Sequence, residues 1–137
     1  MRRKPDEIDM HCSDWAIQRR KILGIILPEM LEPRERLGKL RSTLGAVKTD
    51  AEGASHGKPN QNFPEVYLGM ALVVHRAFTS MRGEWREVMH AHYVFREVPP
   101  KLKCAELGIT QGQYFDRLEK LKIYLESWLM ASGQRSA

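Results

Sequence analysis

Apolar residues recur every three or four positions through the first 47 residues, which is the spacing of amphipathic helices. A first helix is expected after Ser13 and Asp14, which can cap it, and before Pro28. Its apolar positions are Trp15, Ile22, Leu23 and Ile26. After a break bracketed by Pro28 and Pro33, a second helix is expected over residues 34–47. Its apolar stripe consists of Leu37, Leu40 and Leu44.

The composition changes between residues 49 and 64, where glycine, proline, serine and asparagine replace apolar residues. A segment of this length and composition predicts a loop that is mobile or functional. After it, the apolar positions from Val66 to Met81 predict a helix with a wide apolar face, and the pattern repeats from Trp85 to Phe95. Pro99 and Pro100 end that repeat, and Pro100 suits the first turn of a following helix.

The sequence has no run with the two-residue alternation of a strand, and no Asn-Gly or Asp-Gly pair marks a hairpin. It therefore predicts an all-α protein. Because 137 residues are one domain's worth of chain, we expect a single helical domain over residues 1–137. Its expected parts are an N-terminal helical segment (1–48), a flexible loop (49–64), a helical body (65–131) and a disordered tail (132–137).

Charge and hydropathy narrow the class of protein. The chain has 22 Lys and Arg against 17 Asp and Glu, a net charge of +5 that permits phosphate binding without requiring it. The basic cluster at residues 19–21 is expected to be a solvated helix flank. The longest apolar stretch, residues 22–27, is far shorter than the roughly 18 residues of a membrane span, and no apolar signal region follows the N-terminus. Cys12 and Cys104 form no CxxC motif and predict reduced thiols. We therefore expect a cytoplasmic protein without membrane contact.

Metal and catalytic motifs are not evident. His90 and His92 are two positions apart and so lie on different helix faces, and His11 beside Cys12 has no further ligands near it. The sequence contains no phosphate-binding loop, dinucleotide fingerprint, nucleophile elbow or zinc-protease motif. We expect neither an enzyme nor a bound cofactor or metal.

The stretch from Pro100 to Leu129 carries the most informative pattern. Cys104 supplies a small residue where a short helix crosses a longer one, and Gly108 can adopt the positive φ of a turn. Ile109 plugs that turn, and Thr110 is a good N-cap for the second helix. This is the pattern of a helix-turn-helix.

On the second helix, Tyr114, Leu118 and Leu121 are expected to face inward. The outward positions are Gln111, Gln113, Arg117 and Lys120. Glutamine can bond adenine, arginine can bond guanine, and lysine binds phosphates, while a recognition helix presents its N-terminal turns to the major groove. The alternative is an ordinary helical hairpin with a glycine turn, which is favoured by Asp116, because phosphate repels it, and by Gly112, because glycine weakens a helix.

Together with the predicted helix over residues 85–95, this segment resembles the three-helix core of sigma factor region 4. Over residues 63–131 the chain resembles the late-gene antiterminator Q proteins of lambdoid phages, in the class with a sigma-region-4-like body. The resemblance rests on the helix around Met70 and Ala71, on residues 92–94, on the helix-turn-helix and on residues 118–126. A looser match involves Trp15, Ala16, Arg19 and Arg20.

The resemblance implies a phage protein that binds double-stranded DNA at a late promoter. It implies further that the protein joins bacterial RNA polymerase paused there with its sigma factor and lets the enzyme read through terminators, with nascent RNA as a further contact. By position, the DNA-facing residues are Gln111, Gln113, Arg117 and Lys120, and the phosphate contacts are Lys101 and Lys103. Tyr114 departs from the aliphatic residue usual at its position.

Two other functions remain open from the sequence. The same helix-turn-helix would serve a late-gene activator that acts only at initiation. It would also serve an interaction module that grips polymerase without touching DNA.

Overall fold

The computed structural model describes residues 5–28, 30–53 and 67–132, and every regular element within these ranges is helical, which confirms the predicted all-α class. The elements are α1 (Pro5–Leu23), α2 (Pro33–Gly53), α3 (Met70–Ser80), α4 (Gly83–Met89), the π-helix η3 (His90–Val94), α5 (Pro100–Leu107) and α6 (Gln111–Ala131). Within the described ranges, no helix is both long enough and apolar enough to cross a membrane.

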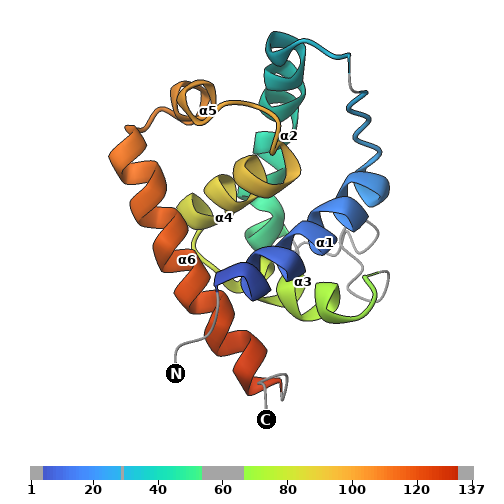
Figure 1. Cartoon of the computed structure of the whole chain (residues 1–137), viewed down its shortest axis with the longest axis vertical. Coiled ribbons are helices and arrows are strands. Elements are labelled where there is room, and N and C mark those ends of the chain that lie inside the picture. Colours follow the sequence, from blue (N-terminus) through green and yellow to red (C-terminus); the bar gives the residue numbers. More distant parts are fainter. Residues whose placement is uncertain (1–4, 29, 54–66, 133–137) are drawn as a thin grey trace.

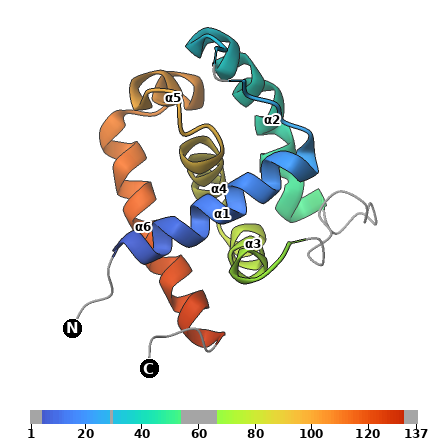
Figure 2. The ribbon, with the colours of Figure 1, turned by 45° about the vertical axis from the view of Figure 1, so that its right-hand side comes forward.

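The helix α4 and its continuation η3 lie at the centre of the arrangement. Both α2 and α6 pack against α4, while α1 packs against η3 and α3 (Figure 1). Figure 2 shows α1 crossing in front of α4, between α6 and α2. Apolar side chains from all of these helices form one buried core, in which Trp15, Phe78, Phe95 and Tyr114 are among the largest members.

The first helix begins at Pro5, so Ser13 and Asp14 lie inside it and the predicted cap is wrong. Ser13 instead accepts a hydrogen bond from Arg96 (Nη1 to Oγ, 2.6 Å). The buried face of α1 consists of Ile8, Cys12, Trp15, Ala16 and Arg19. Ile22 and Ile26, which were expected on the apolar face, are 36% and 69% exposed. Helix α1 ends at Leu23, short of the predicted end before Pro28, so Ile26 lies beyond the helix, while Arg19 occupies a buried position within it.

Within the basic cluster at residues 19–21, Lys21 is exposed as expected, but Arg19 and Arg20 are not part of a solvated flank. The guanidinium of Arg19 is buried 4.7 Å from the ring centroid of Phe78, a cation–π contact, and its Nη1 donates to the hydroxyl of Tyr67 at 3.3 Å. Arg20 donates from Nε and Nη2 to the carbonyl of Val94, at 2.8 and 2.6 Å. These two arginines thus tie α1 to α3 and to the end of η3.

The second helix is longer than predicted, because residues 49–53, which were expected in the loop, continue α2. The rest of the predicted loop, residues 54–64, lies outside the described residues, as do residues 133–137 of the predicted tail. After the end of α3 at Ser80, Gly83 begins α4. The helix predicted over residues 85–95 is confirmed as α4 followed directly by η3. The helix continues from α4 into η3 with the wider π-type turn.

Candidate nucleic-acid interface

The short helix α5 is held in place at both ends. Pro100 occupies its first turn, as predicted, where the missing N–H costs no hydrogen bond. Near its C-terminal end, Glu106 accepts two hydrogen bonds from Arg41 of α2, at 2.7 and 2.8 Å, and this guanidinium holds the pKa of Glu106 below its ordinary value. Cys104 is buried, in keeping with its predicted role as the small residue at the helix crossing. Helix α5, which precedes α6, is therefore fixed in orientation.

The turn between α5 and α6 has the predicted backbone. Gly108 ends α5 at φ 73° and ψ 33°, the left-handed conformation that side chains disfavour. The N–H of Ile109 donates back to the carbonyl of Cys104 at 3.1 Å, and the Ile109 side chain packs partly buried against the core. Residues 108–110 thus connect two helices in fixed register.

The first turn of α6 is closed by a capping box. The hydroxyl of Thr110 accepts from the backbone N–H of Gln113, and Oε1 of Gln113 accepts from the backbone N–H of Thr110, both at 3.0 Å. The predicted cap is therefore confirmed. The box also occupies the amide oxygen of Gln113, although this side chain is exposed, with an intramolecular hydrogen bond.

Replacing Thr110 with alanine should lower the free energy of unfolding by about 1 kcal/mol, because the N–H of Gln113 loses its acceptor. Thr110→Ser is the matched control, since it keeps the hydroxyl and should remain near the wild type. Urea denaturation followed by circular dichroism measures both variants. An equal loss in the serine and alanine variants would contradict the role of the hydroxyl.

The inward face of α6 is the predicted one. Tyr114 and Leu121 are fully buried, Leu118 is buried, and the same face continues through Leu125 and Leu129. The hydroxyl of Tyr114 lies 2.9 Å from Nδ1 of His92. This bond gives the tyrosine a polar partner inside the core.

The six residues predicted to face DNA lie in different environments. Lys101, Gln111, Gln113 and Lys120 are exposed. The ammonium of Lys120 lies 3.2 Å from the carboxylate of Asp116, one turn before it. Arg117 is only 23% exposed, and its Nη2 lies 3.2 Å from the carboxylate of Glu84 in the first turn of α4. That carboxylate also binds Arg82, at 2.5 Å. Arg117 therefore bridges α6 to α4 as well as bordering the exposed face.

Lys103 does not suit a phosphate contact. Its residue surface is only 2% exposed, because it lies on the side of α5 that packs against the core. Burial lowers the pKa of its ammonium to about 8, an effect that Arg96 increases and Glu97 opposes. We therefore correct the expectation for this residue: among the two lysines of α5, Lys101 alone is exposed.

The exposed arc of the first two turns of α6 includes residues that the sequence analysis did not assign to the site. Opposite the buried face lie Gly112 and Asp116, with Phe115 beside them at 46% exposure. Phe115 is four residues after Gln111 and three after Gly112, so the three share one side of the helix. The signal was present in the sequence: if Tyr114 and Leu118 face inward, Phe115 cannot lie fully in the same core.

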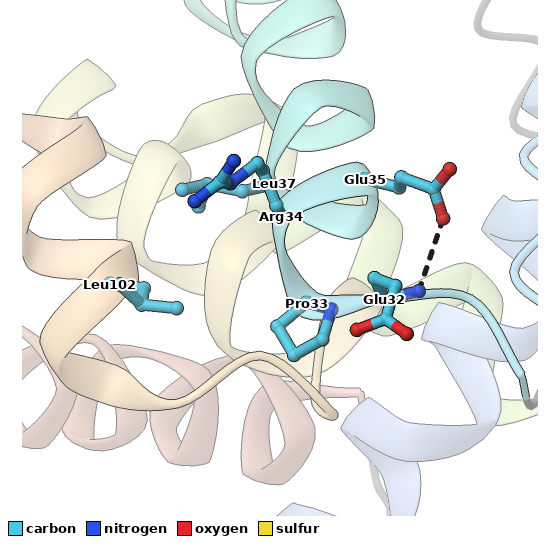
Figure 3. Close-up of a pocket in the computed structure, with 6 residues that line it drawn as sticks. All are labelled: Glu32, Pro33, Arg34, Glu35, Leu37 and Leu102. Atoms are coloured by element: carbon cyan, nitrogen blue, oxygen red, sulfur yellow. Dashed lines mark hydrogen bonds between the residues drawn. The ribbon is translucent and has the colours of Figure 1, made fainter.

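A groove elsewhere on the surface offers a different kind of site. It lies between the start of α2 and α5, with a volume of about 570 Å³, and Figure 3 shows its lining. The lining residues are Glu32, Pro33, Arg34, Glu35, Leu37 and Leu102. Glu35 accepts a hydrogen bond from the backbone N–H of Glu32 at 3.2 Å, so this carboxylate closes the start of α2. The groove brings together no paired acid and base.

Two of the histidines considered for metal binding, His90 and His92, are engaged within the fold. Nε2 of His90 lies 2.8 Å from the hydroxyl of Thr43, and His92 meets Tyr114. Within the described ranges, no three histidine, cysteine or acidic side chains are grouped so as to hold a metal ion. Cys12 and Cys104 are free buried thiols.

No family model, curated protein or solved structure matches this chain.

Proposed function

We propose that this protein is a phage transcription antitermination factor that binds double-stranded DNA through the first turns of α6 and loads onto RNA polymerase. In this proposal, α5 and α6 form a helix-turn-helix, with α6 as the recognition helix in the major groove. The protein joins the polymerase and its sigma factor at a late promoter and then allows the enzyme to read through terminators.

One observation carries the proposal: a capped helix that presents its first turns to solvent, after a left-handed glycine and a three-residue turn. Gln111 lies exposed in the first of these turns, and no hydrogen bond engages its side chain among the described residues. It therefore has both a donor and an acceptor for an adenine edge. Lys101, exposed in the first turn of α5, is placed to contact phosphate.

Transcription in vitro tests the function. The template carries a duplex site selected with the protein from a random library, placed at a promoter that precedes an intrinsic terminator. With bacterial RNA polymerase holoenzyme, the protein should raise the fraction of full-length transcript while total initiation stays level. A rise in initiation with an unchanged terminated fraction would replace antitermination with activation.

Gln111→Ala and Lys101→Ala should weaken DNA binding in different ways. Loss of Gln111 should lower affinity for the selected duplex by about 10-fold or more and leave binding to random duplex unchanged, because it removes a base contact. Loss of Lys101 should weaken binding to both duplexes and reduce the slope of log K against log salt by about 1. Mobility shifts at several salt concentrations measure these effects. Equal losses on both duplexes for Gln111→Ala would contradict base contact.

A second function is favoured by the pairing of the basic side chains. Lys103 is buried and Arg117 binds Glu84, so neither cation is free to contact phosphate. The outward-facing cations are thus fewer than the sequence predicted, which favours a module that grips polymerase without DNA. Co-sedimentation with polymerase in the absence of DNA, together with failure to enrich any duplex from the library, would support that module over the DNA-binding protein.

A further inference from the structure

The exposed ring of Phe115 needs an explanation that the fold does not supply. Four of the neighbouring inward positions of α6 are filled by Tyr114, Leu118, Leu121 and Leu125, so the core does not require another aromatic residue. The ring of Phe115 is 46% exposed one turn after the N-cap. This places a large apolar side chain where the proposed recognition helix would meet bases.

The ring is held rather than free. Its centroid lies 5.1 Å from that of Tyr114, at an interplanar angle of 82°, which is an edge-to-face contact. Tyr114 is itself fixed by burial and by its bond to His92. An aromatic side chain supported in this way loses little conformational freedom on binding, which favours its use as a contact.

Gly112 lies next to Phe115 on the same side of the helix and has no side chain to keep a ligand away. A Cβ at this position would meet only the hydroxyl of Thr110, at 3.8 Å, so internal packing does not require glycine. Glycine is nevertheless unfavourable in a helix. A bare stretch of backbone beside the ring allows α6 to approach a surface outside the protein closely.

Within the proposed function, the amide of Gln111 points to DNA as that surface: Gln111 lies one turn before Phe115 and offers donor and acceptor to a base edge. The charges near the ring are mixed, because Lys120 pairs with Asp116 at 3.2 Å and the exposed Glu119 lies one turn beyond Phe115. In the major groove, the apolar group that a phenyl ring can contact is the 5-methyl group of thymine.

We propose that Phe115 reads a thymine, by packing its ring against the 5-methyl group in the major groove beside the base contacted by Gln111. The inference rests on the proposed DNA binding and names a base that this surface selects. Phe115 acts here as a specificity-determining residue.

Deoxyuridine substitution tests this contact, because deoxyuridine differs from thymidine only by the 5-methyl group. Each thymine of the duplex selected by the wild-type protein is replaced in turn, and the dissociation constant is measured by fluorescence anisotropy. At one position the wild-type protein should bind about fourfold more weakly, the effect of burying one methyl group. Phe115→Ala should bind the thymine duplex more weakly and show no difference between thymine and uracil at that position.

Two further variants separate this contact from a general loss of the fold. Phe115→Leu keeps an apolar side chain and should retain part of the discrimination. Ile123→Ala removes an exposed apolar residue, 63% exposed and two turns further along α6, and should retain all of it. If the wild-type protein is indifferent to every uracil substitution, or if Phe115→Ala keeps the penalty, the thymine contact is overturned and DNA binding stands. If no duplex is enriched, the proposed function falls and this inference with it.

Discussion

Acidification from pH 7 to pH 4 is expected to unfold this protein, because three histidines are held neutral in its interior. Burial is the main cause in each case: it lowers the pKa of His75 to about 3, that of His92 to about 4, and that of His90 well below the ordinary value of 6.5. The positive charge of Arg19 lowers the pKa of His75 and His90 further. The charges of Lys103 and Lys122 do the same for His92, against a smaller opposing effect of Asp9.

The direction of the pH dependence follows from which state takes up protons. In the unfolded chain these histidines bind protons near pH 6.5, whereas in the folded protein His92 stays neutral until about pH 4 and His75 until about pH 3, and the pKa of His90 is likewise held well below its ordinary value. The stabilising contribution is therefore complete above pH 6.5 and falls as the pH drops. Each histidine costs about 1.4 kcal/mol per pH unit, so the three together remove roughly 4 kcal/mol per unit. Summed between pH 6 and pH 4, this loss of unfolding free energy is as large as the 5–15 kcal/mol stability of a typical domain.

His92→Gln tests the assignment, because glutamine keeps a polar partner for Tyr114 and does not titrate. Urea unfolding followed by tryptophan fluorescence, at half-unit steps between pH 8 and pH 4.5, gives the unfolding free energy of both proteins. The variant should be slightly less stable at pH 8 and should lose stability less steeply below pH 6.5, by about 1.4 kcal/mol per unit. Parallel curves for the two proteins would exclude His92 as one of the titrating groups.

The helices of the C-terminal half were largely predictable because local chemistry determines them. Gly108 and Thr110 define the turn and the cap through their own backbone and hydroxyl, and the spacing of Tyr114, Leu118 and Leu121 defines the buried side of α6. None of these features needs knowledge of distant residues. Sequence periodicity therefore gave the correct elements and the correct inward face.

The errors occurred where tertiary contacts override residue type. Arg19 occupies an apolar position of α1 because Phe78 and Trp15 accept its guanidinium against their rings, and both partners are distant or buried. Arg117 meets Glu84, 33 positions away, and only the packing of α4 on α6 brings the two together. From sequence alone, a charged side chain is expected to be exposed to solvent. Which charged side chains instead find a partner inside the protein depends on the tertiary packing.

Lys103→Met is expected to stabilise the protein by about 3 kcal/mol at pH 7, the second large effect that the structure predicts. Lys103 is 2% exposed, and burial lowers the pKa of its ammonium from 10.5 to about 8. The folded protein thus keeps a proton on a buried amine at pH 7 at a cost of about 1.4 kcal/mol for each of the lost pKa units. Methionine has a similar shape and no charge, so it removes the cost and fills the same space.

The pH dependence of that gain separates the charge from packing. The unfolded chain holds the Lys103 proton up to pH 10.5 and the folded protein only to about pH 8, so the penalty is complete below pH 8 and disappears as the pH rises to 10.5. The advantage of Lys103→Met should shrink over that range. Cys12, whose pKa burial raises to about 12, changes wild type and variant alike and cancels in the comparison.

Lys103→Met also tests whether Lys103 contacts phosphate. Because Lys103 lies inside the fold, Lys103→Met should bind duplex DNA with the wild-type affinity and salt slope, whereas Lys101→Ala loses about one unit of that slope. Urea unfolding and mobility shifts on the same preparations give both results. A destabilised variant would show that the ammonium is satisfied in the folded protein, and a gain that persists unchanged at pH 10.5 would show that packing, not removal of the charge, causes it. A reduced salt slope would return Lys103 to the proposed DNA-binding surface.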